Sequence, residues 1–364
     1  MKILLSIFFL PLILATISSF VFSPLVIFIY RLFGWIDDPK KNSHEKVIHT
    51  SPVPRGGGVV VFLSILISSG LFLGYDKHSL GILFGCLVLA VVGVLDDIYD
   101  LSPYLRLGLG LVAAMVVVAS GIGISFITNP FGGVIDLSQL QISFQAFGGL
   151  RTIWVWSDIF AIIWILWSMN MVNWAKGLDG QLPGIVVVAA IVIGVLSLQF
   201  TEDITQWSVS ILAAITAGAY LGFLPWNFYP QKMMPGYGGG TIAGYLLAIL
   251  SILSGAKLAT MIIVLGVPMM DAVYTIIRRV TSGKSPVWGD RGHLHHKLMD
   301  LGWGKRRVSI FYWLITGLLG MIALQLNSKQ KLFTIVLLIL GVGGLLLWLN
   351  YFISYSRRQD RDSG

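Results

Sequence analysis

The stretch Gly93-Val94-Leu95-Asp96-Asp97-Ile98-Tyr99-Asp100 closes an apolar run that is long enough to span a membrane. Ionised carboxylates are costly in hydrocarbon, so a pair at the end of such a run is expected at the water boundary. A divalent cation would stabilise the pair there, because magnesium prefers oxygen ligands. Asp96 and Asp97 are therefore candidate metal ligands, and the alternative is a pair of solvated aspartates that end the helix at the surface.

The composition around this stretch is that of a polytopic membrane protein. The 364-residue chain is 56% hydrophobic and 12% charged, with a mean hydropathy of +0.83, values far from those of soluble domains. The single cysteine, Cys86, lies inside a predicted span, which excludes a disulfide framework. The net charge of +8 comes from basic residues in particular loops, which favours membrane topology and anionic lipid over nucleic acid.

Apolar runs of about 20 residues predict about eleven membrane-spanning helices, in an all-α bundle that forms one integral membrane domain over residues 1–364. The first run lacks a clear small-residue cleavage site and is interpreted as a retained span rather than a signal peptide. The predicted spans are 3–30, 57–75, 79–96, 104–126, 156–173, 181–200, 207–225, 239–256, 258–277, 309–325 and 333–354.

The loops between these spans divide the basic residues unequally. Nineteen of the 25 lysines and arginines fall on one side, which the positive-inside rule assigns to the cytoplasm, with the N-terminus outside and the C-terminus inside. The chemically rich loops fall on the same side, so we expect an active site that faces the cytoplasm. On the other side, residues 127–155 alternate in polarity and predict a small β-hairpin or interfacial flap.

Two glycine-rich stretches on the cytoplasmic side are candidate phosphate cradles. The stretch from His49 to Gly58 contains Pro-Arg-Gly-Gly-Gly, where backbone N–H groups can approach an anion and Arg55 adds a charged donor. Pro235–Thr241 directly precedes an apolar helix, whose free N–H groups and dipole favour phosphate. The alternatives are a plain loop that enters a helix and tight packing between helices.

Amide and carboxylate groups gather between Asn170 and Gln181. Asn170 and Asn173 are one helical turn apart, so both amides are expected to face one cavity. Hydrogen bonding to neighbouring helices is the alternative for these amides. Asp179 lies in a glycine-rich segment, where the backbone is open to a ligand.

The loop over 278–308 carries the densest polar cluster, Gly289-Asp290-Arg291-Gly292-His293-Leu294-His295-His296, with Asp271 upstream. Three histidines beside an aspartate and an arginine suit diphosphate binding, proton handling or a metal site. A permanent zinc site is disfavoured, because a fourth ligand in a closed arrangement is missing.

Taken together and in this order, the motifs resemble the polyprenyl-phosphate N-acetylhexosamine-1-phosphate transferases of bacterial inner membranes. The resemblance implies that a polyprenyl phosphate attacks the β-phosphorus of a UDP-N-acetylhexosamine and releases UMP. This reaction starts the synthesis of cell wall, teichoic acid or lipopolysaccharide glycans. The resemblance favours N-acetylglucosamine 1-phosphate as the group that is transferred. A homodimer is possible for such a protein, and the sequence does not decide the oligomeric state. The motifs that carry the resemblance are Val94-Leu95-Asp96-Asp97, Asn170-x-x-Asn173 with Gly177-Leu178-Asp179-Gly180, and Asp290 to His296.

The resemblance also implies the roles of individual residues. A magnesium ion, with manganese as a substitute, is expected on Asp96, Asp97 and Asp179, and these three residues and His293 are the expected catalytic residues. Arg291 and the histidines would bind the diphosphate, and Arg55 or Lys46 the lipid phosphate. The expected substrate-binding residues are Lys46, His49, Arg55, Asn170, Asn173, Lys176, Asp290, Arg291, His295 and His296.

Two positions depart from the family pattern. The family commonly has an aspartate where Lys176 stands and another where Tyr237 stands, and the second is a metal ligand. One hypothesis is that Lys176 pairs with Asp179 or contacts a phosphate directly. The rival is a catalytically inactive relative that binds carrier lipid or nucleotide sugar. A transporter is a third alternative, but it would favour mid-membrane polar groups and internal repeats, neither of which is clear here.

Overall fold

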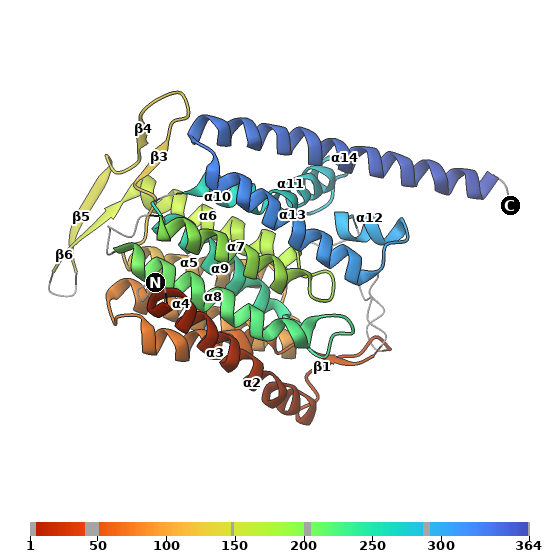
Figure 1. The fold of residues 1–364 in the computed structure, drawn as a ribbon, viewed down its shortest axis with the longest axis horizontal. Coiled ribbons are helices and arrows are strands. Elements are labelled where there is room, and N and C mark those ends of the chain that lie inside the picture. The colour runs from red at the N-terminus through yellow and green to blue at the C-terminus, as the bar shows by residue number, and fades with distance from the viewer. Residues whose placement is uncertain are drawn as a thin grey trace.

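The computed structural model describes residues 5–40, 51–146, 149–199, 205–255, 257–286 and 292–362, and most of them are helical (Figure 1). The helices are η1 (Leu5–Phe9), α2 (Leu10–Leu32), α3 (Gly57–Phe72), α4 (Lys77–Tyr99), α5 (Pro103–Ala119), α6 (Val155–Trp174), α7 (Gln181–Leu198), α8 (Thr205–Asn227), α9 (Gly236–Leu253), α10 (Leu258–Val264), α11 (Gly266–Thr281), α12 (Leu294–Asp300), α13 (Lys305–Gln325) and α14 (Ser328–Asp362).

Among the described residues each predicted span contains a helix, although the span 104–126 runs past the end of α5 at Ala119 to the start of β3 at Phe126. Within the described ranges, eight helices are long and apolar enough to cross a membrane, and α10 with α11, bent by 84°, make a ninth if counted as one span. The apolar helices α3 and α5 are shorter. The structure is therefore consistent with an all-α polytopic membrane protein, whereas the count of eleven and the orientation of the termini stay predictions.

Within the residues that the structure describes, six short strands form three antiparallel pairs. The pair β5–β6 brings Ile142 opposite Ile153 and Ser143 opposite Thr152. In Figure 1 this pair projects from one end of the bundle, and α14 runs along the outside. The pairs are β1 (Ile36–Asp37) with β2 (Val53–Pro54), β3 (Phe126–Thr128) with β4 (Val134–Asp136), and β5 (Gln141–Ala146) with β6 (Gly149–Trp154).

The central helix is α9. In its most apolar 18-residue segment 94% of the residues are buried, whereas in that of α14 only 11% are. Glycines let its neighbours α3, α4 and α6 approach it closely. A Cβ on Gly93 of α4 would lie 2.6 Å from the Cα of Gly238, and one on Gly58 of α3 would lie 2.6 Å from the nitrogen of Gly239. We call Gly58, Gly93, Gly238, Gly239 and Gly240 the glycine seam. The seam brings the C-terminal ends of α4 and α6 beside the N-terminal ends of α3 and α9.

We expect Gly93→Ala to lower the midpoint of thermal unfolding in detergent by several degrees. The added methyl must displace the α9 backbone, and overpacking of this kind destabilises a protein by about 1–3 kcal/mol. Tryptophan fluorescence during heating measures the midpoint.

The matched control is Gly108→Ala on α5, where a Cβ would meet nothing within 4 Å. Because alanine favours helix more than glycine does, this variant should unfold no earlier than the wild type. An equal decrease of the unfolding midpoint in both variants would contradict the close backbone packing at the glycine seam.

Candidate active site

The helix ends that meet at the glycine seam hold a cluster of charged side chains. Asp96 is 4% exposed and accepts a hydrogen bond from Arg106 Nη1 at 3.1 Å. The guanidinium of Arg106 lies 5.4 Å from the ring centroid of Tyr237, and the Tyr237 hydroxyl donates to the Arg106 carbonyl at 3.1 Å. We call Asp96, Asp97, Arg106, Lys176 and Tyr237 the carboxylate cluster.

Asp97 presents one carboxylate oxygen that is bonded and one that is not. The hydroxyl of Tyr30 donates to Oδ2 at 3.2 Å. Oδ1 is buried and has no hydrogen-bond partner within the part of the chain that is described. Gly236, with φ +65°, packs so closely that a Cβ there would lie 2.9 Å from Oδ1. A buried acceptor without a donor is unfavourable, so this oxygen is suited to take a proton or a ligand.

Lys176 follows α6 and reaches into the same cluster. Its ammonium donates to the Gly236 carbonyl at 3.0 Å and lies 5.9 Å from the Tyr237 ring centroid. Burial lowers the pKa of Lys176 to about 8, although Asp96 and Asp97 oppose the shift. The charges of these two aspartates thus act on Lys176. The pair with Asp179 that one hypothesis predicted is not formed among the described residues, where Asp179 has Lys305 nearby instead.

Asp179 belongs to a different set of contacts. It is 2% exposed, and its Oδ2 accepts from the backbone N–H of Gln231 at 3.3 Å. Lys305 Nζ lies 3.8 Å from its Oδ1, and Ser309 Oγ donates to its backbone carbonyl at 2.8 Å. These contacts hold the 175–180 loop against α13 and the residues that follow α8.

The predicted three-carboxylate magnesium or manganese site is not formed. Over the described ranges, no three histidine, cysteine, aspartate or glutamate side chains come together in a way that could hold a metal, because Asp179 is bonded elsewhere. Asp96 and Asp97 remain as two carboxylates that face Arg106 and Lys176. Positive side chains already compensate these carboxylates, so the donor set does not fit the oxygen cage that a hard cation requires.

Arg55 lies at the start of α3, beside the cluster. Its Nη2 and Nε donate to Asp37 Oδ2 at 2.7 and 3.2 Å. Burial lowers the pKa of Arg55, but the Asp37 carboxylate, with Asp97 and Asp100, raises it above the usual value. The guanidinium is therefore a fixed positive charge beside Asp97.

The two asparagines of α6 differ in their contacts. Asn170 Nδ2 donates to the Leu166 carbonyl of its own helix at 2.8 Å. Asn173 Oδ1 is buried, has no hydrogen-bond partner among the described residues, and would collide with a Cβ on Gly240. Only Asn173 therefore lies at the seam with a polar atom unused.

Asp271 of α11 organises the histidines. Its Oδ2 pairs with His293 Nδ1 at 2.9 Å, and its Oδ1 accepts from the backbone N–H of Leu294 at 2.9 Å. The His293 and His295 rings stack at 5.6 Å, and the His296 ring centroid is 4.3 Å from that of His295. Burial lowers the pKa of His295 well below its usual value, so this ring is neutral at pH 7. We call Asp271, His293, His295 and His296 the histidine cluster.

The loop 175–180 joins the two clusters. Lys176 belongs to the carboxylate cluster, and the next residue, Gly177, lies against the His295 ring, which would collide with any Cβ there. Trp174, just before the loop, has its ring centroid 6.1 Å from that of His293. The two clusters are therefore neighbours in the fold. Four predicted substrate-binding residues lie outside the described residues: Lys46, His49, Asp290 and Arg291.

Three partners in these clusters were not predicted. Tyr30 and Arg106 went unassigned, and Asp271 was noted only as a neighbour of the histidine loop. A signal existed for Arg106 and Asp271, because each is a lone charge near or within an apolar helix and so requires a partner. Tyr30 carries no such signal, as its bond to Asp97 joins residues 67 positions apart.

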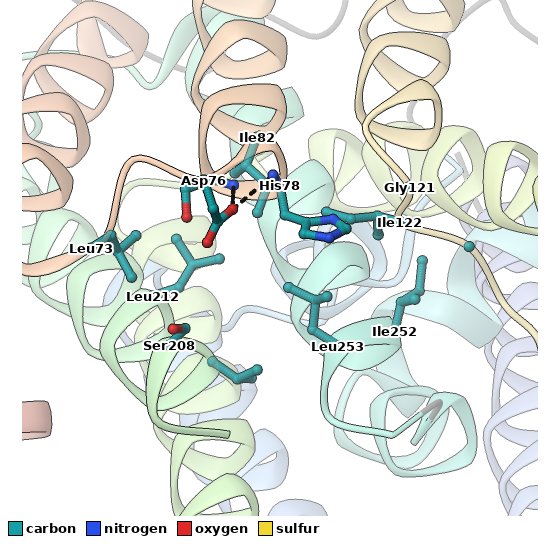
Figure 2. Close-up of a pocket in the computed structure, with 13 residues that line it drawn as sticks. Leu73, Asp76, His78, Ile82, Gly121, Ile122, Ser208, Leu212, Ile252 and Leu253 are labelled. Atoms are coloured by element: carbon teal, nitrogen blue, oxygen red, sulfur yellow. Dashed lines mark hydrogen bonds between the residues drawn. The ribbon is translucent and has the colours of Figure 1, made fainter. Parts of the chain in front are cut away.

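A cavity of about 450 Å³ lies at the opposite end of α4 (Figure 2). There Asp76 caps the helix by accepting from the backbone N–H groups of His78 and Ser79, both at 2.8 Å. Asp76 and Asp96 are separated by 20 residues of helix, a rise of about 30 Å. Among the described residues, the lining contains neither lysine nor arginine, so we do not assign phosphate chemistry to it.

We expect Asp271→Asn to lower turnover about tenfold, because the amide would present an N–H to His293 Nδ1 and change the ring's tautomer or orientation. Initial rates of product formation measure the effect. The control is Thr275→Val, which removes only a 3.4 Å contact between Thr275 Oγ1 and the same nitrogen. The role of Asp271 is refuted if the two variants have equal rates.

Comparisons with known proteins show which proteins the chain is similar to in sequence. Residues 79–255 match the model described as glycosyl transferase family 4. The chain is 29% identical over 341 residues to the probable undecaprenyl-phosphate N-acetylglucosaminyl 1-phosphate transferase of Bacillus subtilis (strain 168), covering 90% of this chain and 88% of that protein. It is 30% identical over 335 residues to the phospho-N-acetylmuramoyl-pentapeptide-transferase of Halalkalibacterium halodurans, covering 87% and 97%.

Proposed function

The chain belongs to glycosyl transferase family 4 and is a phospho-sugar transferase of cell wall biogenesis, and we propose that it transfers N-acetylglucosamine 1-phosphate from UDP-N-acetylglucosamine to a polyprenyl phosphate. The observation that carries this proposal is one group of side chains at the end of the apolar bundle. The charges of Arg55 and Lys176 act on Asp97, whose Oδ1 has no hydrogen-bond partner among the described residues, and Arg106 pairs with the adjacent Asp96.

In the proposed reaction, an oxygen of the lipid phosphate forms a bond to the β-phosphorus of UDP-N-acetylglucosamine. The bond from that phosphorus to the bridging oxygen breaks, and UMP leaves with the bridging oxygen. The product is polyprenyl diphosphate joined to N-acetylglucosamine. Both reactants are anionic, so positioning and charge compensation dominate such a transfer.

The cations divide naturally between the two phosphates. Arg55, at the N-terminal end of α3, would bind the lipid phosphate, while Arg106 and Lys176 would bind the diphosphate. A magnesium ion would supply the same kind of charge compensation, but the described carboxylates do not fit it.

Asp97 would handle the proton. A lipid phosphate that arrives singly protonated can donate to Asp97 Oδ1, which has no other donor among the described residues, and this makes the attacking oxygen more nucleophilic. The neutral ring of His295 and its neighbours His293 and His296 would bind the donor by hydrogen bonds. We further propose that this takes place on the cytoplasmic face of the inner membrane, the side to which most basic residues are assigned.

Release of UMP tests this function. Purified protein in detergent, given UDP-N-acetylglucosamine and undecaprenyl phosphate, should release UMP only when both substrates are present. An inactive relative is the second candidate, which Lys176 and Tyr237 favour because both replace family aspartates. It predicts substrate binding without UMP.

The sugar is tested by competition. With UDP-N-acetylglucosamine and UDP-N-acetylmuramoyl-pentapeptide in equal amounts, mass spectrometry of the lipid product should find N-acetylglucosamine. A muramoyl-pentapeptide product would instead ally the chain with the relative from Halalkalibacterium halodurans.

A further inference from the structure

Lys176 and Asp97 are an ammonium and a carboxylate in the same cluster that are not directly bonded to one another. The Asp97 charge acts on Lys176, yet within the described part of the chain no carboxylate oxygen lies within 4.0 Å of its nitrogen. The only hydrogen bond of the ammonium among these residues goes to the Gly236 carbonyl at 3.0 Å. An ammonium has three donors, so two of them remain for a ligand.

The other charges of this region are already paired. Arg55 is bonded to Asp37 at 2.7 Å and Arg106 to Asp96 at 3.1 Å. Of these three cations, Lys176 is therefore the one whose charge is most available to an anion, and Asp97 Oδ1 is an acceptor without a hydrogen-bond partner among the described residues.

Tyr237 holds this cation in place. Its ring centroid lies 5.9 Å from Lys176 Nζ and 5.4 Å from the Arg106 guanidinium carbon. The face of an aromatic ring attracts cations, and the hydroxyl fixes the ring by donating to the Arg106 carbonyl at 3.1 Å. A phenol provides no carboxylate for a metal ion, so this position supports a fixed side-chain cation instead.

We propose that the Lys176 ammonium, held by Tyr237 and Gly236, supplies the positive charge for the substrate diphosphate, so that diphosphate binding here is independent of divalent metal ions. This rests on the proposed function for the identity of the ligand. The site would then recognise a nucleoside diphosphate group through a charge that is part of the chain.

Calorimetric titration of UDP into the full-length protein in detergent tests the proposal, in EDTA and again in magnesium. The wild type should have the same Kd within about threefold in both buffers, whereas Lys176→Met should bind at least about tenfold more weakly in EDTA. Lys176→Arg keeps the charge and should still bind in EDTA. Lys232→Met is the matched control, since Lys232 lies over Trp226 at 5.3 Å, outside the cluster. Wild-type binding that requires magnesium, or tight binding by Lys176→Met, would overturn the proposal.

Manganese binding, followed by electron paramagnetic resonance without nucleotide, gives a readout that needs neither turnover nor UDP. The wild type should bind no manganese, whereas Lys176→Asp, which adds a third carboxylate to Asp96 and Asp97, should bind it. Manganese bound by the wild type would overturn the proposal. Failure of UDP to bind in either buffer would count against the proposed nucleotide donor, and the manganese result would still decide the role of Lys176.

Discussion

Asp97→Asn is expected to lower kcat by a factor of about 100 or more, with little change in the affinity for UDP. The substitution removes a charge but almost no volume, and the asparagine oxygen can still accept the hydrogen bond that Tyr30 donates at 3.2 Å. The variant loses the basic oxygen that takes the proton. General base catalysis accelerates such reactions by about 10²–10⁴-fold. Initial rates of UMP release at saturating substrates measure kcat.

The control for this variant is Asp100→Asn, three residues further along the same helix end. Asp100 caps α4 in the left-handed region at φ 48°, which asparagine also tolerates, so its folding and turnover should be nearly unchanged. Thermal unfolding of both variants shows whether either has lost structure. Turnover of Asp97→Asn close to that of the wild type would rule out a role for Asp97 in proton transfer.

Arg106→Met is expected to affect both stability and turnover. Asp96 is 4% exposed, and removal of Arg106 leaves this buried carboxylate without its ion-pair partner, which destabilises a fold by about 3 kcal/mol. The variant also loses a cation from the diphosphate site, so UMP release should fall about 100-fold. Denaturant unfolding in detergent and initial rates measure the two effects separately.

A double variant separates the two effects of Arg106. Adding Asp96→Asn to Arg106→Met removes the uncompensated charge, so most of the stability should return. Turnover should remain low, since the cation is still absent. Recovery of both stability and turnover in the double variant would mean that Arg106 serves only to neutralise Asp96.

Much of the fold could be predicted because a membrane leaves few alternatives. A spanning segment must satisfy its backbone internally and present about 20 apolar residues, and each predicted segment contains a helix among the described residues. The family resemblance, which was carried by motifs around Asp96, Asp179 and His293, is confirmed by the comparisons. Motifs of this kind are local in sequence, so they are readable without knowledge of the packing.

The assembly of the site could not be predicted in the same way. Asp96 and Asp179 carry similar motif signals, yet Asp179 is bonded to Gln231 and lies near Lys305, away from α4. Which carboxylates meet depends on how α6 and α9 pack, and that packing depends on glycines whose partners lie far apart in the sequence. The same limitation hid the link between Tyr237 and Arg106, which are 131 residues apart.

The glycine seam also determines when the reacting groups acquire their spacing. Where backbones touch with no side chain between them, as at Gly93 with Gly238 and at Gly58 with Gly239, there are no rotamers to rearrange when a ligand arrives. The separation between the groups that would hold the attacking phosphate and the departing nucleotide is then set during folding rather than on encounter. Preorganisation of this kind favours rate over adaptability, so broader donor acceptance would have to arise on the histidine side of the 175–180 loop.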